Sequence, residues 1–163
     1  MSPQYIIRFD GTDHHFMSNF YPFTPRAGLM DGYDALEIHY EGLVYPSSEH
    51  AFQAAKTLDE EEREKFQNVP SALISKRMGR KVELREDWEE VKDQVMLDVL
   101  RSKFSDPELR DRLLGTEDAV LVEGNWWHDV EWGVCHCDRC MGRGKNMLGT
   151  LLMKVRSEIQ NAQ

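Results

Sequence analysis

The feature that most constrains the fold is a succession of helix start signals that begins after Pro46. Serine, aspartate and asparagine are favoured helix caps, proline is favoured in the first turn, and glycine ends helices. The expected helices begin at Ser47 or Ser48, at Asp59, at Pro70 or Ser71, at Asp87, at Asp106 and at about Asn146. Gly79 and Gly115 stand where two of these helices should stop. The pattern predicts a multihelical chain.

Two of the expected helices carry apolar stripes that indicate a core. Val91, Val95 and Val99 continue a stripe that starts at Trp88, behind a possible capping box at Asp87–Glu90. The last helix has its apolar face at Leu148, Leu151, Leu152, Val155 and Ile159.

The first 45 residues read as irregular chain with short strands. Tyr5–Phe9 is strand-like, and a second alternating segment, Leu36–Tyr40, turns at Glu41–Gly42 into another strand. Ala119–Gly124 is one further strand candidate. We therefore expect a mainly α fold: a single multihelical domain, residues 1–163, with small β-hairpin additions near the N-terminus.

Composition narrows the possible functions. The 163 residues are 40% hydrophobic and 30% charged, which is ordinary for a soluble globular domain, and no apolar run reaches membrane-spanning length. The net charge of -9 argues against an extended grip on nucleic acid but allows a small basic pocket for one phosphate or diphosphate. Three clustered cysteines form a poor disulfide framework, so we expect a reducing, cytoplasmic location.

Glu49, Gln53 and Lys56 lie at i, i+4 and i+7 of the first expected helix and therefore face the same way. Position alone favours a first-turn acid that stabilises its helix. The alternative is one wall of a reaction site, because a carboxylate held near an amine can be tuned as an acid or a base.

Three of the four tryptophans fall in the segment Gly124–Gly133, within a long loop expected from Asn125 to Lys145. Such rings either fasten the loop or line a pocket for a flat ligand, and the sequence favours neither. Asp129 lies among them, where partial desolvation would raise its pKa and suit acid–base work. Basic residues beside glycines at Lys76–Arg80 and Gly142–Asn146 are weak phosphate signals.

Cys135, Cys137 and Cys140 could bind a metal, with His128 as a fourth ligand. His136 sits between two of the thiols and could hardly join all three around one ion. No second C-x-x-C pair exists, so we expect three free thiols in a reduced loop and no metal. A catalytic thiol is disfavoured because no partner base is identifiable.

Six segments, in this order, resemble the NADAR family of NAD- and ADP-ribose-associated N-glycosidases, also called YbiA-like proteins. They are FMSNFYPF (Phe16–Phe23), YPSSEHAFQAAK (Tyr45–Lys56), KRMGR, DWEEVKDQVM, the pair Trp132–Gly133, and GRGKNMLGTLLMKVR. They cover most of the chain from Phe16 to Arg156. The Cys-rich insertion after Asp129 is not a feature of every member.

The resemblance implies a mainly helical fold and cleavage of an N-glycosidic bond to a ribose. Carried over by position, it marks Glu49, Trp88 and Asp129 as catalytic. Expected substrate-binding residues are Ser18, Asn19, Phe20, Gln53, Lys56, Arg77, Gly79, Arg80, Trp132, Gly133, Lys145 and Asn146. No cofactor is expected. Trp88 would either stack on the substrate ring or form one side of the pocket that holds it. Lys56 either positions Glu49 or forms an imine with the opened sugar.

Two substrate types follow from the resemblance: ADP-ribose attached to guanine in nucleic acid, and ribosylamino-pyrimidine 5-phosphates of riboflavin synthesis. Both join a ribose anomeric carbon to an exocyclic nitrogen of a guanine-like ring. The alternative is a non-catalytic module that binds ADP-ribose or an NAD metabolite, which the second carboxylate disfavours. A zinc-dependent nucleic-acid-binding domain is disfavoured by the acidic charge and by an incomplete set of metal ligands. No membrane partner is expected.

Overall fold

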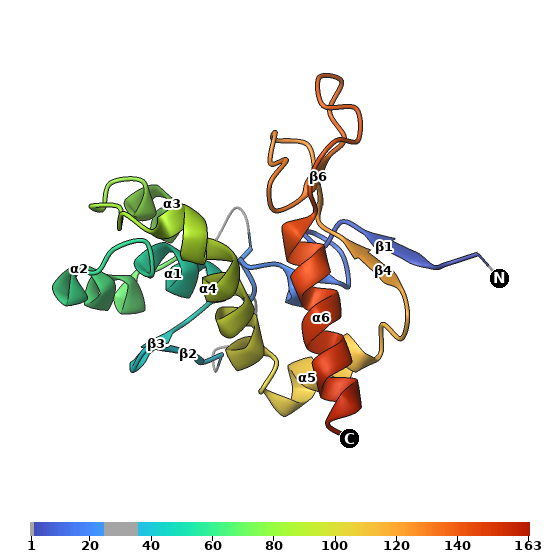
Figure 1. Ribbon diagram of the computed structural model, residues 1–163, viewed down its shortest axis with the longest axis horizontal. Coiled ribbons are helices and arrows are strands. Elements are labelled where there is room, and N and C mark those ends of the chain that lie inside the picture. Colours follow the sequence, from blue (N-terminus) through green and yellow to red (C-terminus); the bar gives the residue numbers. More distant parts are fainter. Residues whose placement is uncertain (1, 25–35) are drawn as a thin grey trace. The chain divides into compact units, whose positions relative to one another are not determined.

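The computed structural model describes residues 2–24 and 36–163. Within those ranges the chain forms six α-helices and six strands of two or three residues (Figure 1). Its internal contacts group the residues into two compact units: Met1–Ser18 with Pro107–Gln163, and Asn19–Asp106. None of the helices in the described ranges is both long enough and apolar enough to span a membrane.

The Asn19–Asp106 unit contains a hairpin and four helices. The hairpin pairs β2 (Ile38–Tyr40) with β3 (Leu43–Tyr45), as the alternation at Leu36–Tyr40 predicts. Its two turn residues, Glu41 and Gly42, both have positive φ, the geometry that matches the twist of a two-residue hairpin. The helices are α1 (Ser48–Ala54), α2 (Glu60–Lys65), α3 (Ala72–Gly79) and α4 (Trp88–Lys103).

Side-chain caps fix where three of these helices begin. The Ser47 hydroxyl accepts a hydrogen bond from the His50 N–H (3.2 Å), and Ser71 does the same for Ile74 (3.2 Å). Asp59 caps α2 in the same way. The capping box expected at Asp87–Glu90 is wrong, because the Asp87 carboxylate turns back to pair with Arg85 (2.6 Å) and makes no cap hydrogen bond.

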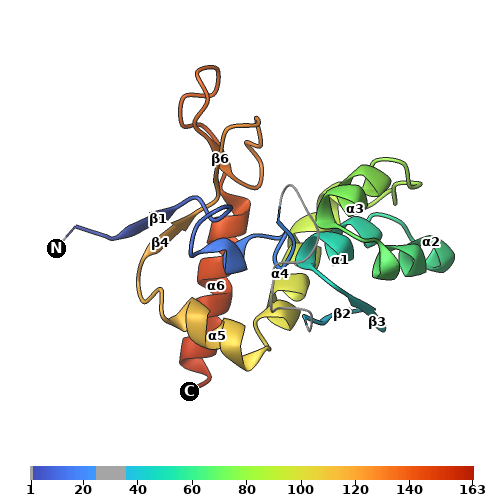
Figure 2. The same cartoon turned by 180° about the vertical axis from the view of Figure 1, so that it is seen from behind.

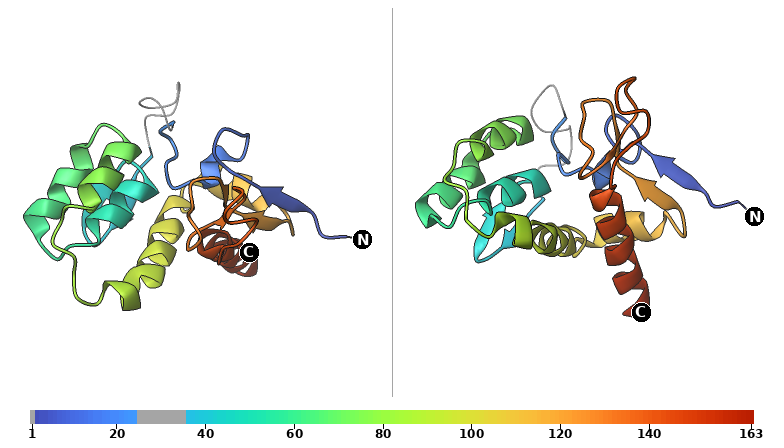
Figure 3. Two further views of the ribbon diagram at one scale, coloured as in Figure 1. Left: turned by 90° about the horizontal axis from the view of Figure 1, so that it is seen from above. Right: turned by 45° about the horizontal axis from the view of Figure 1, so that its top comes forward.

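Helix α1 is the centre of this unit. All seven of its residues are buried, and it packs against α3 and α4, as the views in Figure 3 also show. The stripe from Trp88 along α4 is largely confirmed, since Trp88, Val95 and Val99 are buried and only Val91 is half-buried. Because α1 is fully buried, its polar side chains are largely removed from water.

The other unit holds β1 (Tyr5–Ile7), α5 (Pro107–Leu114), β4 (Val120–Val122) and α6 (Met147–Asn161). The strands β1 and β4 pair in parallel, and α6 packs against β4 (Figure 2). A second parallel pair joins β5 (Gly124–Asn125) to β6 (Val134–Cys135), so the segment expected to be a loop contains a strand.

Candidate active site

Glu49 is the buried carboxylate of the Asn19–Asp106 unit. It lies in the first turn of α1 and its residue is only 6% exposed. Its backbone N–H donates to the Asn19 carbonyl (2.9 Å), and its Oε1 accepts a hydrogen bond from Gln53 Nε2 (2.7 Å). The i, i+4 spacing seen in the sequence therefore joins these two side chains directly, and Gln53 orients the carboxylate.

Gly79 makes room for the Gln53 side chain. A Cβ at Gly79 would stand 1.9 Å from Gln53 Oε1 and 2.8 Å from its Cδ, far inside contact distance. Gly79 was expected to bind substrate through its backbone; the contacts found here give it a packing role between α3 and α1. Gln53 Oε1 is buried and has no hydrogen-bond partner among the described residues.

Lys56 brings a cation to the same helix. It is half-buried just beyond the end of α1, and its amine is 6.0 Å from the centre of the Trp88 ring. Burial lowers the pKa of the Lys56 amine, and the positive charges of Lys76 and Arg80 act in the same direction, whereas Glu49 opposes them. The charges of Lys76 and Arg80 thus reach Lys56 beside the buried carboxylate.

Trp88 forms a wall. Its ring packs on Phe52 of α1 with ring centres 5.0 Å apart, and the residue is only 6% exposed. Burial of this extent favours the wall over the stacking platform, the two roles expected from the sequence.

Lys76 is a ligand candidate that the sequence analysis placed within the weak phosphate signal at Lys76–Arg80 but did not single out. Its amine lies 5.9 Å from the centre of the Phe20 ring, and it shares with Arg80 an electrostatic effect on Lys56. Lys76 and Arg80 are four residues apart, so they share a helix face, while the exposed Arg77 points about 100° away from Lys76. The four-residue spacing of Lys76 and Arg80 is therefore the feature of the sequence that could have identified Lys76.

The S-N-F segment divides between the units. Ser18 is buried in the first, and its hydroxyl is hydrogen-bonded to Asp10, whose pKa it helps to lower. Asn19 belongs to the second unit, where its carbonyl accepts the Glu49 N–H. The Asn19 Oδ1 is buried and has no hydrogen-bond partner among the described residues. Asn19 therefore contacts Glu49 through its backbone.

Asp129 is held in the other unit by a turn. Its Oδ1 accepts hydrogen bonds from the backbone N–H groups of Trp132 (2.9 Å) and Glu131 (3.2 Å). The side-chain amide of Asn125 donates to the Asp129 carbonyl (2.7 Å). Trp126 and Trp127 are 49% and 54% exposed, whereas Asp129 and Trp132 are half-buried, so the partial desolvation expected for this carboxylate stays a prediction.

Gly133, Lys145 and Asn146 have local partners. A Cβ at Gly133 would lie 2.3 Å from the Glu123 carbonyl oxygen, so the loop requires glycine there. The Lys145 amine pairs with Glu131 (2.7 Å). Asn146 Nδ2 donates to the Leu121 carbonyl and its Oδ1 accepts from the Glu123 N–H, which ties the start of α6 to β4. These contacts give Gly133 and Asn146 structural roles.

A separate group of possible metal ligands lies in the same unit as Asp129. The ligand atoms of His128, Cys135, Cys137 and Cys140 all lie within 4.8 Å of one another.

Comparison with known proteins shows which class of enzyme this chain resembles. The N-glycosidase YbiA of Escherichia coli is 44% identical to this chain over 144 residues, which are 86% of the chain and 87% of that relative. The NMR structure of E. coli YbiA superposes with a TM-score of 0.77 at 37% identity, covering 99% of this chain and 88% of that one. The protein is therefore an enzyme of the glycosidase class.

The family follows from the same comparison. The NADAR domain matches residues 7–160, and the chain belongs to the NADAR family. The riboflavin biosynthesis protein VVA0006 of Vibrio vulnificus is 34% identical over 151 residues, covering 91% of this chain but 36% of that protein. The chloroplastic riboflavin biosynthesis protein PYRR of Zea mays is 36% identical over 130 residues, 72% of this chain and 20% of that one.

Proposed function

We propose that this enzyme hydrolyses the bond between a ribose anomeric carbon and an exocyclic nitrogen of a guanine-like heterocycle, with a phosphate at the ribose 5-position. The observation that carries the proposal is the Glu49 carboxylate, buried, oriented by Gln53 and set among basic side chains of its own unit. An oriented carboxylate can act on the ribose, and nearby cations can bind its phosphate, so this arrangement suits a ribose phosphate substrate.

The chemistry explains why a carboxylate is needed. Cleavage of an N-glycosidic bond builds positive charge on the ribose ring, in an oxocarbenium-like transition state. A preoriented, poorly solvated carboxylate stabilises that charge more strongly than water does, because it needs no reorganisation when the charge develops. Gln53 supplies the orientation, since its amide holds one oxygen of Glu49 at 2.7 Å.

The basic side chains account for the phosphate. Lys76 of α3 and Arg80, the residue just after that helix, are one turn apart and both act electrostatically on Lys56. Charge-assisted hydrogen bonds from lysine and arginine are the usual means of holding a phosphate. Three cations are a small patch, which fits a single phosphate or diphosphate better than a nucleic-acid backbone and is consistent with the net charge of -9.

The riboflavin-pathway ribosylamino-pyrimidine 5-phosphates are the substrates we favour. Two relatives that include a stretch similar to this chain are named riboflavin biosynthesis proteins. ADP-ribose attached to guanine is the second candidate, because it presents the same ribose, exocyclic nitrogen and 5-phosphate. We propose cytoplasmic action on either substrate.

Lys56 has a second possible use. Its lowered pKa leaves a larger share of the amine uncharged, as a nucleophile requires. In that route the amine adds to the anomeric carbon of the ring-opened glycosylamine and expels the heterocyclic amine. One water then hydrolyses the lysine imine, which releases the free sugar aldehyde and restores the Lys56 amine. Asp129 remains the proposed second carboxylate on the strength of the family resemblance.

A substrate panel tests the proposal. The purified protein is incubated with a ribosylamino-pyrimidine 5-phosphate, with its dephosphorylated form and with an ADP-ribosylated guanine oligonucleotide, and free sugar is measured. We expect rapid cleavage of the first and much slower cleavage of the second. Cyanoborohydride added during turnover traps a sugar adduct at Lys56 only if the imine route operates. Failure to release sugar from every phosphorylated substrate would refute the proposed function.

A further inference from the structure

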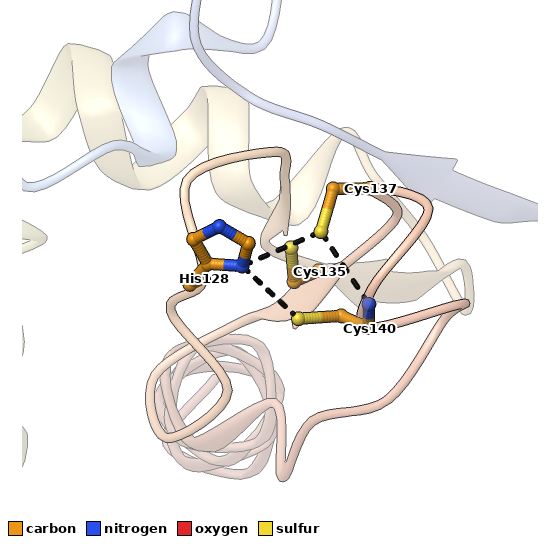
Figure 4. A group of neighbouring side chains, drawn as sticks. All are labelled: His128, Cys135, Cys137 and Cys140. Carbon is orange, nitrogen blue, oxygen red and sulfur yellow. Dashed lines mark hydrogen bonds between the residues drawn. The ribbon is translucent and has the colours of Figure 1, made fainter.

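The loop between β5 and α6 brings three thiols and one imidazole to a single point. Cys135 ends β6, Cys137 and Cys140 flank a tight turn, and His128 comes from the segment before β6. Figure 4 shows the three sulfur atoms and the His128 ring turned toward one another. All four ligand atoms lie within 4.8 Å of one another.

We propose that these four residues bind one structural zinc ion. Zinc prefers four tetrahedral ligands of this kind, and a set of three cysteines and one histidine is a recognised closed site. With zinc bonds of about 2.3 Å to sulfur and about 2.0 Å to nitrogen, a tetrahedron has nitrogen–sulfur edges of about 3.5 Å. The Nδ1 of His128 lies 3.4 Å from the sulfur of Cys140 and 3.4 Å from that of Cys137.

Hydrogen bonding does not account for this arrangement. The Nδ1 atom of a neutral imidazole has either one proton or one lone pair, so it can serve only one of the two sulfur atoms at a time. A cation at the centre attracts the imidazole lone pair and all three thiolates together. His128 also adopts a positive φ of 69°, a conformation that L-residues seldom take, and there its Nδ1 is directed at the sulfurs.

The backbone of the turn is shaped around the sulfur atoms. The Cys140 N–H points at the Cys137 sulfur (3.4 Å), and the Met141 N–H bonds the Cys137 carbonyl (2.8 Å). Arg143 donates through Nε to the Cys140 carbonyl (2.8 Å) and through Nη2 to the Arg139 carbonyl (2.7 Å). Three thiolates around Zn²⁺ leave one net negative charge, which the Arg143 guanidinium beside the turn would offset.

His136, the residue between Cys135 and Cys137, is not part of the cluster. His136 is exposed, and its ring lies against Trp126, with centres 5.5 Å apart. The crowding expected from the sequence, with His136 wedged between two thiols, is therefore relieved because His136 turns away. His128, eight residues away in sequence from His136, supplies the fourth ligand.

This loop buries little apolar surface of its own. The apolar side chains of Trp127, Val130 and Met141 are 54%, 43% and 77% exposed. Strands β5 and β6 have only two residues each. Segments that bury so little apolar surface are commonly fastened by disulfides or metals, and an odd number of thiols cannot all be paired as disulfides within one chain. All four ligands come from the protein, so the site is closed and structural rather than catalytic.

The metal content of the protein tests the inference directly. The chain is produced in zinc-supplemented medium, purified without chelator or a histidine tag, and analysed by inductively coupled plasma mass spectrometry. We expect one zinc per chain, with all three thiols protected from a thiol-reactive dye until a strong chelator is added. Cobalt substituted for zinc should give the absorption bands of a tetrahedral thiolate site.

Variants identify the ligands. Cys140→Ser and His128→Ala should each lower the zinc affinity at least tenfold, a loss of the order found for altered metal sites. His136→Ala is the matched control, because it removes an adjacent histidine that lies outside the cluster, and it should keep one zinc per chain. His128 is exposed, so its variant should fold even if Cys140→Ser does not.

Protein that binds no zinc or cobalt, either as purified or after reduction and incubation with the metal, would overturn the inference. So would equal loss of zinc in His136→Ala and His128→Ala. A failed substrate panel would leave these metal measurements unaffected, so this inference and the proposed function can fail separately.

Discussion

Gln53 is the residue on which the direction of the Glu49 carboxylate depends. It is buried, it donates to Glu49 across one helical turn, and its amide occupies the space that a side chain at position 79 would need. The spacing of Glu49 and Gln53 predicts that they face the same way, and the structure confirms it. Their dependence on Gly79 could not be predicted, because it arises from the close approach of α3 to α1.

Gly79→Ala should therefore reduce activity without touching any reacting group. The new methyl group would meet Gln53 Oε1 at 1.9 Å, so the amide must leave its place beside Glu49. Overpacking of this kind destabilises proteins by about 1–3 kcal/mol, and misplacing a catalytic group lowers turnover by about tenfold or more. Urea unfolding and steady-state kinetics measure the two effects.

A double-mutant cycle provides the control. In a Gln53→Ala background the clash with the amide is gone, so Gly79→Ala should destabilise the protein less than it does in the wild type. The same loss of stability in both backgrounds would show that Gly79 is required for some reason other than Gln53.

At the scale of elements, the position of each basic residue around α3 underlies our proposal that Lys76 and Arg80 bind the substrate phosphate. Lys76→Ala and Arg80→Ala should each raise KM for a 5-phosphorylated substrate by about tenfold, the value of one charge-assisted hydrogen bond. Arg77→Ala is the matched control, because it removes an exposed arginine that, unlike Lys76 and Arg80, does not contribute to the pKa shift of Lys56, and it should change KM less than about twofold. None of the three should matter for a dephosphorylated substrate. A larger effect at Arg77 than at Lys76 would reverse this assignment.

Helix α1 also carries a buried histidine that makes stability depend on pH. The His50 ring is fully buried, its Nδ1 is 2.6 Å from the Ser47 hydroxyl, and its Nε2 is 3.0 Å from the Val69 carbonyl. Burial lowers the pKa of His50 from 6.5 to about 4. Between these values the unfolded chain binds more protons than the folded one, so acid favours unfolding.

The stability that neutral His50 provides is therefore complete above pH 6.5 and falls as the pH drops toward about 4. The shift corresponds to a loss of about 3 kcal/mol at most. Urea unfolding at neutral and acidic pH should show a smaller acid-dependent loss for His50→Gln than for the wild type. His39→Gln, at an exposed position of β2, should behave like the wild type. An unchanged pH dependence in His50→Gln would contradict the assignment.

Local chemistry predicted most element boundaries, and tertiary contacts account for the exceptions. Ser47 and Ser71 cap their helices as expected, each accepting a hydrogen bond from the backbone N–H three residues later. Asp87 does not cap α4, because Arg85 two residues earlier takes its carboxylate. A cap inferred from spacing alone cannot include such competition.

At the scale of the whole molecule, the contacts that sequence patterns could not supply are those between distant segments. The parallel pairing of β1 with β4 joins residues more than a hundred positions apart. The convergence of His128 with three cysteines depends on a left-handed residue and on the turn after β6. The role of Asn146 in joining α6 to β4 likewise has no local signal, although the family resemblance marks the residue.

Asp129 tests whether the unit formed by Met1–Ser18 and Pro107–Gln163 contributes to catalysis. Asp129→Asn keeps an Oδ1 that can accept the Glu131 and Trp132 N–H groups, so the turn should persist. If Asp129 acts on the cationic ribose, kcat should fall about a hundredfold while the Kd of ribose 5-phosphate changes little. Asp138→Asn, an exposed acid of the same loop, is the control. Equal losses in rate and affinity would make Asp129 a binding residue.

The central claim is that the buried carboxylate of Glu49 drives cleavage, and Glu49→Gln tests it most directly. The substitution keeps the size of the side chain and removes its charge. With a ribosylamino-pyrimidine 5-phosphate as substrate, the account predicts a folded protein that binds ribose 5-phosphate normally and turns over at least about a hundredfold more slowly than the wild type. Glu60→Gln, an exposed acid on α2, should retain full activity. A folded Glu49→Gln enzyme with turnover within about threefold of the wild type would contradict the account.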